Sequence, residues 1–239
     1  MGINIFLLLV DKHSRVEARG CFCYNIIELL LNLSKGRSPE LQGYKYMKNI
    51  IHIFGASGSG TTTLAKKISR ELGYTMMDTD DYYWMPTEPK FTRKRPVDER
   101  LRLMIRDIDN SENVVISGSL TDWGDVLIPY FTLAIRIELE QDLRMERLIK
   151  RERERYGSRI DPGGDMYQQH IDFVKWARAY DNGGMDMRSK VKHDDWQKLL
   201  LCDIIYLDGV DTLENNYAKV LENLDNRLDL DGRRGEDNE

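Results

Sequence analysis

From residue 50 onward, the chain alternates short runs of apolar, often β-branched residues with longer segments in which apolar side chains recur every three or four positions. The short runs are almost continuously apolar, as is typical of strands buried on both faces of a parallel sheet. They predict five strands, at Ile50–Phe54, Tyr74–Met77, Val114–Ser117, Thr132–Ile137 and Asp203–Leu207.

The segments between these runs carry the spacing of helices that cover a sheet. The clearest is Thr61–Leu72, which is followed by Gly73 in the position that ends many helices. Asp78–Pro96 holds three prolines and several aromatic residues, so we expect a loop or lid there. Alternating strands and helices predict an α/β protein with a five-stranded parallel sheet in a three-layer α/β/α arrangement. The other predicted helices are Val97–Asp109, Leu139–Arg155 and Thr212–Leu224.

Charge divides the 239-residue chain into unequal parts. Residues 1–46 carry six basic and four acidic side chains, whereas the rest of the chain has a net charge of −7. Met47 directly precedes the first predicted strand. We therefore expect a functional domain at 47–226 and an acidic tail at 227–239. Residues 1–46 are predicted to be an N-terminal extension or the result of a start assigned upstream of a native start at Met47.

The composition, 41% hydrophobic and 31% charged, favours a globular domain over a membrane bundle. The apolar run Ile3–Val10 is too short to span a bilayer, and no basic residue precedes it as in a secretion signal. A net charge of −5 predicts neither a nucleic-acid nor a membrane partner. Three scattered cysteines form no disulfide framework, which favours a cytoplasmic location. A monomer and a homodimer both remain open.

A glycine-rich turn joins the first predicted strand to the first helix. Gly55 and Gly60 have the separation of the P-loop pattern G-x-x-x-x-G-K-[ST], and Thr62 occupies the position whose hydroxyl holds Mg²⁺. Such a turn points backbone N–H groups at a bound anion, and the helix behind it adds its positive end. We expect ATP phosphates to bind along this turn, at Gly55, Ser57, Gly58, Ser59, Gly60, Thr61, Thr62 and Thr63.

The P-loop lysine is absent, because Thr61 stands in its position. That lysine normally reaches the β- and γ-phosphates, so its loss affects catalysis more than binding. The turn also resembles that of NAD-dependent short-chain dehydrogenases, but it is one residue shorter between its first two glycines. Thr63 stands where the dinucleotide fingerprint needs a glycine. The dehydrogenase is therefore the weaker alternative.

An acidic cluster follows the second predicted strand, at the end of the sheet where such folds bind ligands. Asp80 is the predicted general base toward an acceptor hydroxyl, or a partner of Mg²⁺ through water. Asp78 and Asp81 are expected to face the substrate, and Gly118, after the third strand, is expected to let it approach closely. An acidic surface turn is the alternative interpretation.

Six arginines lie between positions 144 and 159. Arg151 and Arg155 are one helical turn apart, so their guanidinium groups form a stripe that could close over phosphates as a lid and act in catalysis. Arg159 is expected to contact the substrate. A solvated helix in which glutamates pair with the arginines is the alternative.

Four segments together resemble the nucleoside and nucleotide kinase group of P-loop NTPases, which includes adenylate-kinase-like, shikimate-kinase-like and topology-modulation proteins. They are IIHIFGASGSGTTTLAKKI, DTDDYYW, VVISGS and RLIKRERERYGSR, and the resemblance covers about Met47–Leu224. It implies ATP and Mg²⁺ as cofactors and a small-molecule kinase that transfers the γ-phosphate to a nucleoside, nucleotide or similar acceptor. The missing lysine leaves a second possibility, a nucleotide-binding regulatory protein with impaired catalysis.

Overall fold

A computed structural model of the chain describes residues 48–236, and the side chains of residues 48–225. The predicted extension at 1–46 and the last three residues of the predicted tail lie outside the described residues. The strands are β1 (Ile50–Gly55), β2 (Thr75–Asp78), β3 (Val114–Ser117), β4 (Leu133–Glu138) and β5 (Asp203–Asp208). The helices are α2 (Thr61–Leu72), α3 (Thr79–Tyr83), α4 (Val97–Asp109), α5 (Gln141–Tyr156), α6 (Tyr167–Arg178), α7 (Lys190–Trp196) and α8 (Leu213–Glu236), with short 3-10 turns η1 (Asp125–Tyr130), η2 (Gly157–Ile160) and η3 (Gln197–Leu199).

The five strands form one parallel sheet in the order β2-β3-β1-β4-β5. β1 lies at the centre, where Ile51 pairs with Val115 of β3 on one side and with Leu133 of β4 on the other. The predicted five-stranded parallel sheet is therefore confirmed. The central position of β1 also brings the glycine-rich turn that follows it to the middle of the sheet's carboxyl edge.

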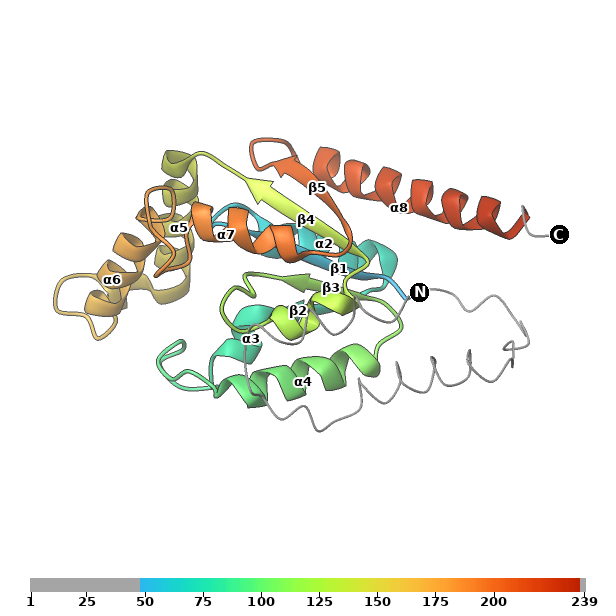
Figure 1. Cartoon of the computed structure of the whole chain (residues 1–239). Helices are drawn as coiled ribbons and strands as arrows, with labels where there is room; N and C mark the ends of the chain where they lie inside the picture. Colours follow the sequence, from blue (N-terminus) through green and yellow to red (C-terminus); the bar gives the residue numbers. More distant parts are fainter. Residues whose placement is uncertain (1–47, 237–239) are drawn as a thin grey trace. The chain divides into compact units, whose positions relative to one another are not determined.

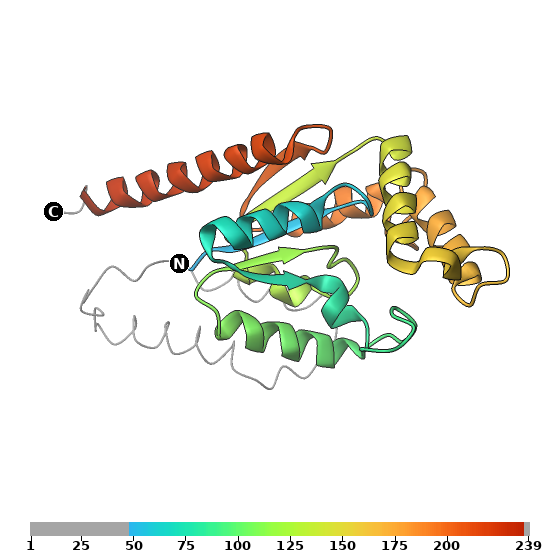
Figure 2. The same ribbon diagram turned by 180° about the vertical axis from the view of Figure 1, so that it is seen from behind.

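Apolar side chains of β1 alternate between the two faces of the sheet. Ile51 and Ile53 belong to the core beneath α2 and α8, and Ile50 and Phe54 belong to the core beneath α4, η1 and α7. Each such fully buried side chain contributes about 1.5–3 kcal/mol to folding. Figure 1 shows α7 in front of the sheet, and Figure 2, from behind, shows α2 in front of it. The predicted three layers are confirmed.

Helices α5 and α6 stand beyond the end of the sheet toward which the strand arrows point (Figures 1 and 2). This is the end at which the glycine-rich turn and the acidic cluster lie. Within residues 48–236, no helix is long and apolar enough to cross a membrane.

Four helices depart from the sequence-based prediction. The expected loop at Asp78–Pro96 begins with α3, because the Asp78 carboxylate accepts the Asp80 N–H and caps the helix. α6 and α7 were not predicted; α7 begins where the Ser189 hydroxyl accepts the Lys192 N–H at 3.1 Å. α8 continues beyond its predicted end at Leu224 to Glu236; no glycine or proline interrupts residues 225–231, and the helix also includes Gly232.

Candidate functional site

The glycine-rich turn leaves the amino end of α2 open. The first hydrogen bond of α2 runs from the Leu64 N–H to the Gly60 carbonyl at 3.0 Å, so the amides of Thr61–Thr63 have no acceptor within the helix. Gly60 supplies no side-chain cap. At Gly58, with φ +88°, a β-carbon would lie 2.5 Å from the Arg144 carbonyl oxygen, so only glycine lets the turn pack this closely against α5. The turn therefore has the form of an anion cradle.

Two hollows meet at this cradle. The main cavity, of about 1230 Å³, opens over the carboxyl edge of the sheet and is lined by the turn, the acidic cluster, α5 and α6. A groove of about 410 Å³ lies on the other side of the turn, toward the loop that follows β5. The residues that line both hollows are Gly58, Thr61, Thr62 and Arg151. A phosphate at the amino end of α2 would therefore lie between the two spaces.

Two carboxylates stand on the main-cavity side of the cradle. Asp78 accepts the Thr62 hydroxyl at 3.2 Å and the Asp80 N–H at 3.1 Å, so its carboxylate lies at the amino end of α2. Asp80 is exposed where it faces the main cavity, and the surrounding protein atoms reduce the hydration of its carboxylate. Burial and the charge of Asp78 raise the pKa of Asp80, while nearby arginines oppose the rise. A carboxylate with a raised pKa is suited to act as a general base.

Two predicted substrate residues do not line either hollow. Asp81 lines neither hollow, since the next step along α3 turns it away from Asp80. Arg159 lies at the surface, where its guanidinium is 2.7 Å from Asp165 and 2.9 Å from Glu88. Because the Arg159 guanidinium is paired with these two carboxylates, the structure does not bring Arg159 to the site.

The arginines of α5 divide among several roles. Arg151 and Arg155 line the main cavity, as a lid over it would require. Arg147 lies in the groove, where it donates to the Gly209 carbonyl at 3.0 Å. Arg144 is fully buried and pairs with Asp181, so it holds α5 in place rather than facing a ligand.

An arginine that the sequence analysis missed reaches the glycine-rich turn. The Nη2 of Arg188 donates to the Ser57 hydroxyl at 2.5 Å, and its guanidinium lies 4.5 Å from the ring centre of Trp176 on α6. Its Nε is buried without a hydrogen-bond partner among the described residues. Burial lowers the pKa of Arg188, and the negative charge of Asp80 opposes this. The one sequence signal near it is Ser189, a helix-capping residue type.

Helix α7, which follows Arg188, is fixed to the loop after β3. Lys192 is buried and lies 2.7 Å from the Asp122 carboxylate. His193 lies 3.0 Å from the Ser119 hydroxyl and 2.8 Å from the Tyr180 hydroxyl. Burial and nearby arginines lower the pKa of His193 well below its ordinary value, so the ring is neutral near pH 7. These contacts hold the segment that carries Arg188 against the site.

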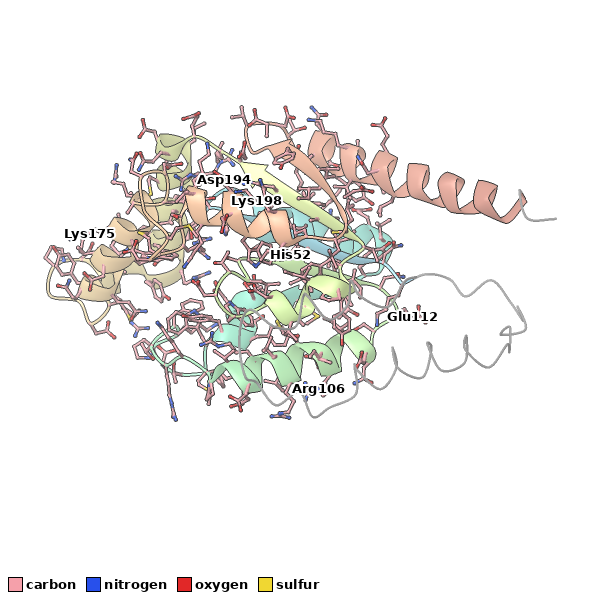
Figure 3. All side chains as sticks on the ribbon, in the orientation of Figure 1. His52, Arg106, Glu112, Lys175, Asp194 and Lys198 are labelled. Carbon is pink, nitrogen blue, oxygen red and sulfur yellow. The ribbon has the colours of Figure 1, made fainter. Side chains whose placement is uncertain are left out.

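Gly118 lines the main cavity, yet its closest neighbour is the protein itself. A β-carbon at Gly118, with φ +110°, would lie 1.9 Å from the Thr79 hydroxyl oxygen. Its carbonyl accepts the Nε2–H of His52 at 2.9 Å, and burial lowers the pKa of His52 to about 4. His52 lies deep in the fold beneath α7, with Trp196 at 5.4 Å (Figure 3). Gly118 is thus required by internal packing, and His52 is structural.

The far wall of the main cavity is aromatic and cationic. Arg100 is 6% exposed, and its guanidinium carbon lies 3.8 Å from the ring centre of Tyr83 and 5.4 Å from that of Trp123. Its Nε donates to a backbone carbonyl at 2.7 Å. No carboxylate of residues 48–225 lies within 4.0 Å of this guanidinium. Trp84 and Lys94 line the same wall.

A family model described as an AAA domain matches residues 51–168, from β1 into α6. The uncharacterized protein YqaC of Bacillus subtilis (strain 168) is 41% identical to this chain over 178 residues, which cover 74% of the chain and 98% of YqaC. The chain belongs to the YqaC family. The expected P-loop NTPase fold is confirmed by the domain match and the sheet order.

Other proteins are similar to this YqaC-family chain over shorter spans or at lower identity. A probable gluconokinase of Xenopus tropicalis is 29% identical over 79 residues, covering 29% of this chain and 42% of that protein. A crystal structure of a shikimate kinase from Bacteroides thetaiotaomicron is 16% identical with a TM-score of 0.46, covering 74% of this chain and 98% of that one. Arg188 lies beyond the span that the AAA-domain model matches.

Proposed function

We propose that the protein is an ATP-dependent phosphotransferase that moves the γ-phosphate of ATP to a small acceptor in the main cavity. The observation that carries this proposal is the open amino end of α2 between two hollows, with the Asp80 carboxylate on one side. Two substrates in separate spaces would meet at the residues shared by both. A phosphoryl group there would be cradled by the Thr61–Thr63 amides.

The groove suits the nucleotide, because it lies along the amides of α2 and is lined by Arg147 and Asn216. Thr62 and Asp78 supply a hydroxyl and a carboxylate oxygen side by side, which are ligands that Mg²⁺ accepts. No cluster of three or more histidine, cysteine or acidic side chains in residues 48–225 forms a metal cage. This fits an ion that takes its remaining ligands from phosphates and water. When bound, Mg²⁺ offsets negative charge on the phosphates.

Asp80 is the proposed base. Its raised pKa lets it accept the proton of an acceptor hydroxyl as the oxygen attacks phosphorus. Arg151, which lines both hollows, would lie beside the transferred group and stabilise its charge. These roles keep Asp80 and Arg151 as predicted from the sequence and move the metal contact from Asp80 to Asp78.

The acceptor is proposed to carry a planar group, a negative charge and a free hydroxyl, as a nucleoside monophosphate does in its base, phosphate and ribose. A buried guanidinium without a carboxylate partner binds a carboxylate or phosphate strongly, and Arg100 is such a group on the cavity wall. Tyr83, Trp84 and Trp123 offer flat surfaces beside it. This proposal narrows the sequence-based expectation of a nucleoside, nucleotide or similar acceptor.

The test is ADP formation from ATP and Mg²⁺ with a panel of nucleosides, nucleoside monophosphates and shikimate. At least one acceptor is expected to be consumed, and Asp80→Asn is expected to lower kcat about 10²–10⁴-fold. Asp81→Asn, one residue away but outside the cavity, is the matched control and is expected to keep the wild-type kcat. Binding of ATP without turnover of any acceptor would favour the regulatory protein, and binding of NAD but not ATP would favour the dehydrogenase.

A further inference from the structure

We infer that Arg188 takes the place of the missing P-loop lysine at the transferred phosphate, an inference that rests on the proposed phosphotransferase. The P-loop has a threonine, Thr61, where a lysine would supply positive charge. Arg188 brings that charge from a segment 131 positions farther along the chain than Ser57, whose hydroxyl it contacts.

The position of Arg188 fits the role. Its Nη2 lies 2.5 Å from the hydroxyl of Ser57, which lines the main cavity but not the groove. Asp80, the proposed base, and Arg151, which lines both hollows, are close enough to Arg188 to affect its pKa. The guanidinium therefore lies on the acceptor side of the cradle, at the place where the phosphoryl group would cross.

The unused hydrogen-bonding capacity of Arg188 points to an anionic ligand. Its Nε is buried and unpartnered, and no carboxylate of residues 48–225 lies within 4.0 Å of its guanidinium. A desolvated cation without an ion pair is costly to the fold. Phosphate oxygens would satisfy two N–H groups at once in the fork geometry of arginine.

Arg151 lines both hollows and acts beside Arg188 in the proposed transfer, whereas several other cations near the cradle are engaged elsewhere. Lys67 pairs with Glu214 of α8 at 2.8 Å, and Lys66 is exposed. Arg147 donates to a backbone carbonyl in the groove, and the guanidinium of Arg155 lies 5.2 Å from the ring centre of a phenylalanine. Within the described residues, Arg188 is the cavity cation that contacts a side chain of the glycine-rich turn.

The step balances with the groups already named. The acceptor hydroxyl gives its proton to Asp80, and its oxygen forms a bond to the γ-phosphorus of ATP. The bond from that phosphorus to the β–γ bridging oxygen breaks, and ADP leaves with the electron pair. Arg188 donates N–H groups to the γ-phosphoryl oxygens throughout, so it lowers the energy of the transferred charge without changing its own protonation.

The experiment combines Arg188→Ala, Thr61→Lys and the double variant, with Lys190→Ala as the matched control. Lys190 is an exposed cation two residues away that lines neither hollow. Arg188→Ala is expected to lower kcat about 10³-fold, in the range of arginines that act on phosphoryl transfer. Thr61→Lys in the Arg188→Ala background is expected to recover at least tenfold of this loss. Lys190→Ala is expected to match wild type.

A second readout does not depend on turnover. Calorimetry gives the ratio of the Kd values for ADP and a non-hydrolysable ATP analogue, both with Mg²⁺. Arg188→Ala is expected to reduce the preference for the triphosphate about tenfold, and Thr61→Lys to restore it. Far-UV circular dichroism shows whether each variant is folded, and Arg188→Lys, which keeps the charge, serves in place of an unfolded alanine variant.

The outcomes separate the two proposals. If wild type turns over an acceptor and the kcat of Arg188→Ala stays within threefold of the wild-type kcat, the inference about Arg188 is overturned and the proposed phosphotransferase is kept. If wild type turns over no acceptor but Arg188→Ala still loses the preference for the triphosphate, the proposed phosphotransferase is overturned. Arg188 is then kept as a ligand of the γ-phosphate. An unchanged triphosphate preference in Arg188→Ala, or no recovery by Thr61→Lys, also overturns the inference.

Discussion

His52 makes the stability of the protein depend on pH. Its ring is fully buried in β1, with ring centres of Phe54 and Phe131 at 5.3 and 4.9 Å. Its Nε2–H donates to the Gly118 carbonyl, and its Nδ1 has no partner. Burial lowers the pKa of His52 from 6.5 to about 4, because a charged ring there would lose its hydration.

The sign and size of the effect follow from linkage. Between pH 6.5 and 4 the unfolded chain binds a proton at His52 that the folded chain does not, so stability falls as the pH falls through this window. A full change across it costs about 3 kcal/mol. The lowered pKa of His193 acts in the same direction, so wild type should lose more than this single contribution.

The perturbation is His52→Gln, whose amide can still donate to the Gly118 carbonyl but does not titrate. Urea unfolding at pH 7.0, 5.5 and 4.5 measures the free energy of unfolding of both proteins. Over this range wild type is expected to lose about 2–3 kcal/mol more than the variant. Equal losses in the two proteins would refute the reasoning, since they would mean that His52 is protonated in the folded state as readily as in the unfolded chain.

Two further predictions concern other parts of the molecule. Arg136 is 2% exposed, and its closest partner is the Asp194 carboxylate at 2.6 Å. Asp194→Ala removes this partner and should lower the free energy of unfolding, measured in urea, by about 2 kcal/mol. Its neighbour Asp195 lies in an exposed pair, so Asp195→Ala should change stability by less than about 0.5 kcal/mol; an equal effect of both would contradict the burial argument. Arg100→Met should raise the KM of a negatively charged acceptor about 10²-fold while leaving the KM of ATP unchanged, and an unchanged acceptor KM would contradict the assigned anion contact.

The strands could be predicted to within a residue or two. β1 and β3 are buried along their whole length, whereas the edge strands β2 and β5 are partly exposed. The strand Val114–Ser117 is correct at both ends, and its four residues are all buried. The helix Val97–Asp109 is also correct, since its apolar stripe is regular and a proline precedes it. In both cases local sequence and tertiary burial impose the same pattern.

The unpredicted elements depend on contacts between distant parts of the chain. Among the side chains of α6 only that of Ala177 is buried, so its sequence carries little of the apolar periodicity that indicates a helix. α7 is seven residues long and is held by partners such as Asp122 and Ser119 from another loop. A pattern read along the sequence does not contain these partners.

The same distinction explains where the structure places the predicted site residues. The glycine-rich turn is local, so its spacing was sufficient to predict an anion cradle next to α2. Asp80 and Asp81 are adjacent in sequence, and only the turn of α3 decides that one opens onto the cavity and the other does not. Arg159 was grouped with the arginines of α5, but it follows that helix, where the chain turns toward Asp165.

Supplying the catalytic charge from Arg188 would make phosphoryl transfer depend on the docking of α7. A lysine within the P-loop is fixed by the loop itself, whereas Arg188 is held by the helix that begins after it. That helix is anchored by the pair of Lys192 and Asp122 and by the hydrogen bonds of His193. Loosening α7 would therefore withdraw charge from the transferred phosphate while the cradle that binds ATP stays intact. A P-loop without its lysine can in this way retain catalysis, at the cost of coupling it to a contact between distant parts of the fold.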